Sequence, residues 1–219
     1  MQVHYTLTIG TKDWSSWSLR PYMALRAIDV PFEEDLVQLR RDSTTEEVER
    51  RTPAGRVPVL KIEENGASYI VWDSLAICET LAERHPEAEL WPSDARTRAQ
   101  ARSYCAEMHS GFPDVRDQLT MDFARRLPTP DLREPTKKQM ARIIAAWTAV
   151  LGRYENEGGF LFGRFSVADC MYAPVVSRFV TYGIELPTHA RRYVDRVFAL
   201  QAMQDWGKAA KAEIDAGLA

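Results

Sequence analysis

The sequence predicts an α/β unit over residues 1–85 followed by an all-α unit over residues 95–219. Three observations lead to this division. Alternating apolar and polar residues, the pattern of half-buried strands, occur only in the first part of the chain. The segment 86–94 contains two prolines and is typical of a linker. Beyond it, the apolar residues recur at helical spacing, which predicts a helical bundle.

The first strands and the first helix follow from the residue pattern. Apolar and polar residues alternate over residues 3–9, which predicts a strand with one buried face. Residues 19–28 have helical spacing. This helix should begin near Ser18, because Pro21 then falls in the first turn, where its missing N–H group costs no hydrogen bond. A weaker pattern over residues 32–39 predicts the second strand.

The rest of the first unit consists of a short helix, a hairpin and a last helix. Ser43 and Glu46 have the spacing of a capping box, which predicts a polar helix that ends before Pro53. Residues 64–66 are typical of a hairpin turn, with Gly66 at positive φ. The two hairpin strands and the last helix are predicted at residues 57–63, 67–72 and 75–84. The order β-α-β-α-β-β-α predicts a mixed four-stranded sheet, because the crossover helix makes the first strand pair parallel and the hairpin adds an antiparallel edge.

The second unit should contain only helices. Residues 95–121 and 134–157 are the long helix candidates, and Gly158–Gly159 should end the second of them. Ser166 and Asp169 have capping-box spacing at the start of another helix, so we interpret them as folding determinants. The buried face of that helix is predicted to contain Met171, Val175, Val176 and Phe179.

Composition excludes several classes of partner. The net charge is -3 and both signs are interspersed, so the chain lacks the basic surface that nucleic acids require. The sequence shows neither an apolar run of about 20 residues nor a signal pattern at the N-terminus. We therefore expect a cytoplasmic protein without a nucleic-acid or membrane partner. The odd number and wide separation of the cysteines favour reduced core thiols over disulfides or a metal site, at Cys78, Cys105 and Cys170.

Three polar segments together indicate chemistry on a bound thiol. Residues 15–18, Ser-Ser-Trp-Ser, lie between a strand and a helix, where thiol-handling folds often carry a C-x-x-C pair. Hydroxyls donate hydrogen bonds to a sulfur anion but form no disulfide. The extended backbone at Val57–Pro58 can pair with a peptide, or it can simply begin an edge strand. Asp73–Ser74 can offer a helix N-terminus to an anion, or it can be a plain helix cap.

The order and spacing of four segments resemble those of glutathione S-transferases over nearly the whole chain. These segments are residues 15–20 (SSWSLR), 55–60 (GRVPVL), 73–77 (DSLAI) and 166–169 (SVAD). The double serine is most similar to the zeta class, which includes maleylacetoacetate isomerases, and to related bacterial transferases. The zeta pattern has a cysteine after the two serines and then R-x-R. This chain has Trp17 and Arg20-Pro21-Tyr22 instead.

The resemblance implies a thioredoxin-like domain over 1–85, a linker over 86–94 and a helical-bundle domain over 95–219. It also implies glutathione as co-substrate, no metal and a homodimer. Ser15 matches the catalytic serine, and Pro58 is expected to be cis. The other residues implied to bind glutathione are Ser16, Trp17, Arg56, Val57, Pro58, Asp73 and Ser74. The acceptor pocket should be lined by the first helix of the second domain, through Met108, His109 and Phe112, with Arg116 a weaker candidate that we expect on a solvated helix face.

The sequence leaves several functions and roles open. We expect an enzyme that conjugates glutathione to a small hydrophobic electrophile. The alternatives are glutathione-dependent cis-trans isomerisation of the maleylacetoacetate type and a non-catalytic interaction module on the same fold. Disulfide reduction is disfavoured, because residues 15–18 contain no cysteine. Whether Ser15 or Ser16 contacts the thiolate is open, and Ser18 is expected to be the N-cap of the first helix.

Overall fold

The structure is a computed structural model that describes residues 3–154 and 157–219. Its first part contains a four-stranded sheet with the strand order β2-β1-β3-β4. β1 is parallel to β2 and antiparallel to β3, and β4 is an antiparallel edge strand. The predicted mixed sheet and element order are thus confirmed. The elements are β1 (His4–Gly10), α1 (Ser16–Ile28), β2 (Glu33–Val37), α2 (Thr44–Glu49), β3 (Val59–Glu64), β4 (Ala67–Trp72) and α3 (Ser74–Arg84).

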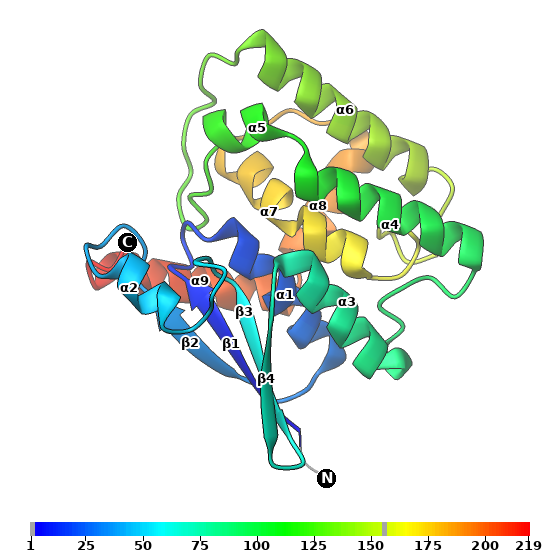
Figure 1. Ribbon diagram of the computed structural model, residues 1–219. Coiled ribbons are helices and arrows are strands. Elements are labelled where there is room, and N and C mark those ends of the chain that lie inside the picture. Colours follow the sequence, from blue (N-terminus) through cyan, green and yellow to red (C-terminus); the bar gives the residue numbers. More distant parts are fainter. Residues whose placement is uncertain (1–2, 155–156) are drawn as a thin grey trace.

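The second part is helical and lies above the upper end of the sheet in Figure 1. α7 runs through its middle and is buried along almost its whole length, because its four predicted face residues and most of the others are apolar. α1 packs against both α3 and α7 and so joins the two parts. The helices are α4 (Ala95–Ser110), α5 (Pro113–Gln118), α6 (Glu134–Leu151), α7 (Val167–Thr181), α8 (Thr188–Phe198) and α9 (Gln201–Asp215).

Local turn chemistry places several element ends as predicted. Asn65 and Gly66 both have positive φ, 51° and 77°, so the hairpin turn takes the conformation that Asn-Gly favours. At the start of α7, Asp169 Oδ2 accepts hydrogen bonds from the Ser166 amide at 2.9 Å and from the Ser166 hydroxyl at 3.1 Å. The capping box is therefore confirmed. The three cysteines are free and buried, also as predicted.

The predicted helix over residues 95–121 is wrong, because the chain breaks at 111–113. A Cβ atom at Gly111 would lie 2.7 Å from the Glu107 carbonyl oxygen, so only glycine fits at this bend. Phe112 has a φ of 61°, and Pro113 then starts α5 as a separate helix. The predicted helix over 134–157 ends earlier, at Leu151. Residues 155–156 of that prediction lie outside the described residues.

The predicted start of α1 and the predicted capping box of α2 are also wrong, although α2 does begin directly after Ser43. α1 begins at Ser16 with Ser15 as N-cap, so Ser18 is not the cap and Pro21 lies beyond the first turn. Ser43 precedes α2 but makes no capping hydrogen bond, because its hydroxyl donates to the Glu47 carboxylate at 2.7 Å instead. The placement of the domain boundaries at 85 and 95 stays a prediction. Over the described ranges, the structure contains no helix long and apolar enough to cross a membrane.

Candidate functional site

The sheet register brings the three polar segments to one end of the sheet. Val59, the first residue of β3, pairs with Thr8 on β1 and with Trp72 on β4. The residues before Val59, after β1 and after β4 therefore meet at the same end, which faces the helical part in Figure 1. Val57–Pro58 and Asp73–Ser74 come directly from these strand ends. The loop after β1 carries Ser15.

Ser15 lies at the N-terminus of α1, with its hydroxyl in a short hydrogen-bond chain. The Gly10 amide donates to Ser18 Oγ at 3.1 Å, and Ser18 Oγ lies 2.7 Å from Ser15 Oγ. No side-chain hydrogen bond caps α1 in the described part of the chain. Both Ser15 and Ser16 are buried. When Ser18 donates to Ser15, the Ser15 proton is free to donate to a further acceptor.

The peptide bond between Val57 and Pro58 is cis, as the resemblance implied. Val57 is half-buried and Arg56 is exposed, and β3 begins two residues after Val57. The backbone of Val57 thus lies outside the sheet ladder, next to the other two segments. Within the described residues the strand pairing begins only at Val59, so the Val57 backbone is available to a peptide ligand.

Asp73 and Ser74 form the N-terminus of α3. Asp73 has a φ of 74°, and its Oδ1 accepts hydrogen bonds from the Leu75 and Ala76 amides at 2.9 and 3.2 Å. Its other oxygen, Oδ2, lies 3.1 Å from His109 Nε2 on α4. Ser74 is buried, and its hydroxyl oxygen accepts a hydrogen bond from Arg20 on α1. Asp73 is therefore a helix cap and also a link to the helical part.

Two arginines contact the Trp17 ring: Arg20, to which the sequence interpretation gave no role, and Arg116, which was only a weak candidate. The Arg20 guanidinium carbon lies 4.1 Å from the Trp17 ring centroid, and that of Arg116 lies at 4.8 Å. Arg20 Nη1 donates to Ser74 Oγ at 3.3 Å, whereas its Nε and Nη2 have no hydrogen-bond partner within the described residues. Burial, and then the neighbouring Arg116, lower the pKa of Arg20 to about 9. The site therefore contains a buried and largely unpaired cation.

Arg116 is not on a solvated helix face, so that expectation is wrong. It is partly buried, and it donates hydrogen bonds to the backbone carbonyls of Met108 and Gly111, which join α4 to α5. Burial lowers its pKa. Sequence interpretation assigned Arg116 only a weak place in the acceptor pocket and assigned Arg20 no role there, because their burial depends on the packing of α1 against the helical part.

Of the three predicted pocket residues, His109 is the one whose side chain contacts other site residues, Trp17 and Asp73. Its ring meets Trp17 edge to face, with 5.3 Å between the centroids. Burial lowers the pKa of His109, and nearby Arg20 and Arg116 add to this effect while Asp73 opposes it. Met108 and Phe112 are buried in the hydrophobic core. The two do not share a helix face, since α4 ends at Ser110.

Known proteins with the same organisation identify the family. Residues 14–84 match the protein family described as "Glutathione S-transferase, N-terminal domain", and residues 130–196 match the family described as "Glutathione S-transferase, C-terminal domain". A relative named "Probable maleylacetoacetate isomerase" from Caenorhabditis elegans is 32% identical, over 78% of this chain and 77% of its own. The chain belongs to the glutathione S-transferase family.

Solved glutathione S-transferases share the whole fold. A maleylacetoacetate isomerase from Anaeromyxobacter dehalogenans, solved with glutathione bound in its active site, matches with a TM-score of 0.68 and 27% identity. The match covers 94% of this chain and 95% of that one. Glutathione transferase Omega 2S from Trametes versicolor matches with a TM-score of 0.72 and 21% identity, over 99% of both chains. These family members include glutathione-dependent enzymes, and this chain is an enzyme of the same type.

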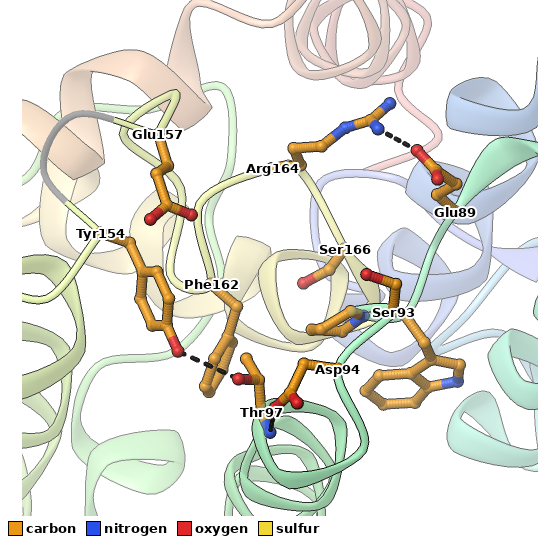
Figure 2. Close-up of a pocket in the computed structure, with 11 residues that line it drawn as sticks. Glu89, Ser93, Asp94, Thr97, Tyr154, Glu157, Phe162, Arg164 and Ser166 are labelled. Atoms are coloured by element: carbon orange, nitrogen blue, oxygen red, sulfur yellow. Dashed lines mark hydrogen bonds and ion pairs between the residues drawn. The ribbon is translucent and has the colours of Figure 1, made fainter.

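This glutathione S-transferase also has a cavity of about 240 Å³ that shares no residue with the site around Ser15. Figure 2 shows it between the segment before α4 and the chain that leads into α7. Tyr154 and Thr97 point toward one another there, with 3.2 Å between their hydroxyl oxygens, and Arg164 pairs with Glu89. These contacts hold two segments of the chain together at the edge of the helical part.

Proposed function

We propose that this chain binds glutathione, holds its thiol as a thiolate through the Ser15 hydroxyl, and transfers it to a small hydrophobic electrophile. The observation that carries the proposal is the meeting of Ser15, Val57–Pro58 and Asp73–Ser74 at one end of the sheet. Each segment suits a different part of the tripeptide. Relatives solved with glutathione support the choice of ligand.

The peptide part of glutathione has complementary groups in this site. The Val57 backbone would pair with the cysteinyl unit as a short ladder. The γ-glutamyl carboxylate would bind Ser74 and the N-terminus of α3, and Arg20 adds positive charge directly behind Ser74. The glutamyl ammonium would meet the Asp73 carboxylate. Ser16, Trp17 and Arg56 remain proposed neighbours of the ligand, and these roles rest on the resemblance.

A hydrogen bond from Ser15 is strong enough to lower the pKa of a bound thiol to near neutral pH. A free cysteine thiol has a pKa of about 8.5, and lowering it by about two units requires about 2.7 kcal/mol of selective anion stabilisation. A hydrogen bond to a charged acceptor contributes about 1.5 to 3 kcal/mol. The N-terminus of α1 adds about 0.3 to 1 kcal/mol. Ser15 and the helix together therefore hold the thiolate without a general base.

Two serine variants test the assignment. The pKa of the bound glutathione thiol is measured from the ultraviolet absorbance of the thiolate against pH, and binding is measured by calorimetry. Ser15→Ala should raise this pKa by about one to two units, because it removes the charged hydrogen bond. Ser16→Ala is the matched control and should leave the pKa near that of the unmodified chain. The reverse result would assign the role to Ser16, and a folded protein that binds no glutathione would refute the whole proposal.

Isomerisation is the second candidate, and two observations favour it. Several relatives are named maleylacetoacetate isomerase, and the partly buried cation Arg116 suits an acceptor that carries carboxylates. The two reactions differ in the fate of glutathione. An isomerase converts many equivalents of maleylacetoacetate for each glutathione added, whereas conjugation consumes one glutathione for each acceptor. Counting free thiol during turnover separates them, and the absence of both reactions would leave the non-catalytic module.

We also propose that the chain is a homodimer, as the family resemblance implies. Tyr69 and Trp72 are exposed large apolar residues of the edge strand β4, which suits a contact surface. Analytical ultracentrifugation should give twice the mass of 25.0 kDa. A mass of one chain at micromolar concentration would refute the dimer.

A further inference from the structure

The loop that carries Ser15 is held by residues far away in the sequence. We define the Ser15 loop as residues 11–15, between β1 and α1. Inside the loop, the Ser15 amide donates to the Thr11 carbonyl at 2.8 Å and the Trp14 amide donates to the same oxygen at 3.1 Å. The position of Ser15 is therefore fixed by the backbone of the residues just before it.

The C-terminal helix α9 uses both peptide groups of Lys12, in the middle of this loop. Glu213 Oε2 accepts a hydrogen bond from the Lys12 amide at 2.6 Å, and Trp206 Nε1 donates to the Lys12 carbonyl at 2.9 Å. Trp206 is fully buried and Glu213 is nearly so. Figure 1 shows α9, in red, at the upper end of β1 where the loop begins. We call Trp206 and Glu213 the C-terminal clamp.

A second contact holds the other side of the loop. The carbonyl of Asp13 accepts from the Phe123 amide at 3.1 Å, and Asp13 Oδ1 accepts from the Ala124 amide at 2.8 Å. Segment 123–124 in turn packs closely on α9, because a Cβ atom at Gly207 would lie 2.9 Å from Phe123 Cε1. The loop is thus enclosed by α9 and by the chain between α5 and α6. Any movement of α9 would be transmitted to the Ser15 backbone from two directions.

The carboxylate of Glu213 is held in the interior chiefly by this loop. Burial raises the pKa of Glu213, and the hydrogen bond from the Lys12 amide, followed by the Lys12 charge, opposes that rise. A buried carboxylate and a buried amide each lose hydrogen bonds to water when the chain folds. The hydrogen bond between them offsets this free-energy cost for both groups. A charged clamp on a backbone amide restricts the loop more than apolar packing does, because its geometry is directional.

We propose that Trp206 and Glu213 are positioning residues for Ser15, so that the C-terminal helix determines how well the serine hydroxyl reaches the thiolate. This inference rests on the proposed function of Ser15. A displacement of about 1 Å at a catalytic group can cost about a hundredfold in rate, so a small relaxation of the loop has a measurable effect. The clamp residues touch neither glutathione nor the acceptor in this proposal. They act through the Lys12 peptide.

Three variants separate positioning from simple stabilisation. Trp206→Phe keeps an aromatic ring and removes the hydrogen bond to the Lys12 carbonyl, whereas Glu213→Gln keeps an acceptor and removes the charge. Trp147→Phe is the matched control, because Trp147 is an equally buried indole of α6 whose Nε1 has no partner among the described residues. The clamp variants should raise the pKa of the bound glutathione thiol by about one unit and lower kcat about tenfold, with little change in glutathione Kd. Trp147→Phe should lower Tm and leave that pKa unchanged.

A second measurement does not depend on glutathione. Ser15→Cys introduces a thiol at the position of the serine, and the three native cysteines are buried. The pH dependence of its alkylation by iodoacetamide should shift by about one unit when Trp206→Phe or Glu213→Gln is added, and should not shift when Trp147→Phe is added. If neither clamp variant changes the alkylation profile, the positioning role is refuted. If the profile shifts but the unmodified chain never lowers the glutathione thiol pKa, the clamp stands and the proposed function fails.

Discussion

The helices α1 and α7 both follow a serine, but their N-termini are built in opposite ways. At α7, the Ser166 amide and hydroxyl both donate to Asp169, and the second Asp169 oxygen accepts from the Leu161 amide at 3.1 Å. At α1, no side chain caps the helix in the described residues, and the Ser15 hydroxyl contacts only Ser18. The first end is closed by its own residues. The second is open to a ligand.

The difference shows where each region obtains its stability. The α7 end is satisfied by a motif of four consecutive residues, so it folds from local contacts. The N-terminus of α1 is held indirectly. Glu213 and Trp206 of α9 bind the loop before it, and α1 itself packs on α7. Donors left free at a helix end are poorly satisfied before a ligand binds. An open end supported from outside is therefore the arrangement expected of a binding site.

The largest predicted effect concerns the closed end and its dependence on pH. Burial raises the pKa of Asp169 from 3.8 to about 6, and its hydrogen bonds from Leu161 and Ser166 only partly oppose this. The unfolded chain thus releases this proton at lower pH than the folded chain. The stability contributed by the protonated group is complete below pH 3.8 and is lost as pH rises to about 6.

The variant Asp169→Asn should remove this dependence. One pKa unit corresponds to about 1.4 kcal/mol, so the unfolding free energy of the unmodified chain should fall by about 3 kcal/mol relative to Asp169→Asn across this range. Urea unfolding at a series of pH values measures the difference. Asp13→Asn is the control, because burial also raises the pKa of Asp13 but this residue lies in the Ser15 loop, and its substitution should leave the dependence that Asp169 contributes in place. A constant difference between pH 4 and pH 6 would show that Asp169 titrates normally.

Two buried arginines extend the comparison. Arg178, on α7, donates to the Leu119 carbonyl at 2.7 Å and to the Pro174 carbonyl at 3.2 Å. Arg20, on α1, has two nitrogens without partners among the described residues. Burial lowers the pKa of both to about 9. Arg178 donates to backbone carbonyls, whereas Arg20 has N–H groups that remain available to a ligand.

Substitution by methionine should separate these two roles. Arg178→Met removes the side-chain donor of the Leu119 carbonyl and should lower the unfolding free energy by about 2 kcal/mol without weakening glutathione binding. Arg20→Met should leave stability unchanged or raise it by about 1 kcal/mol, because a buried cation without a partner is costly. It should weaken glutathione binding about tenfold, because the carboxylate loses a cation behind Ser74. A strongly destabilised Arg20→Met protein would assign Arg20 a structural role instead.

Local patterns were sufficient to predict most of the fold. The strand alternation, the Asn65–Gly66 turn and the Ser166–Asp169 box each act within a few residues, and each was confirmed. The helix over 95–121 was mispredicted because its periodicity continues across the bend, which is decided by a close approach at Gly111 and the left-handed Phe112. The spacing of apolar residues in a sequence does not show how closely two backbone segments approach one another.

The site was less accessible to sequence reasoning. Its polar segments could be identified, since residues 15–18, 57–58 and 73–74 carry recognisable chemistry. Arg20 received no role and Arg116 only a weak one, because a charged residue on a helix is exposed in most proteins and their burial arises from contacts between distant helices. The clamp at Glu213 was missed for the same reason. Glu213 accepts a hydrogen bond from the backbone amide of Lys12, and any residue other than proline offers such an amide, so the sequence does not point to this contact.

The smallest predicted effect is a change in unfolding free energy, and it compares the closed N-terminus of α7 directly with the open N-terminus of α1. Ser166→Ala removes a hydroxyl from a formed capping box and should lower the unfolding free energy by about 0.5 to 2 kcal/mol. Ser15→Ala removes a hydroxyl that caps nothing and should change it by less than about 0.5 kcal/mol. Denaturant unfolding of the two variants measures both effects, and the bound thiol pKa should move in the opposite pattern, with Ser15→Ala alone raising it. Equal losses of stability would mean that the α1 end is also closed, and the distinction between the two helices would then fail.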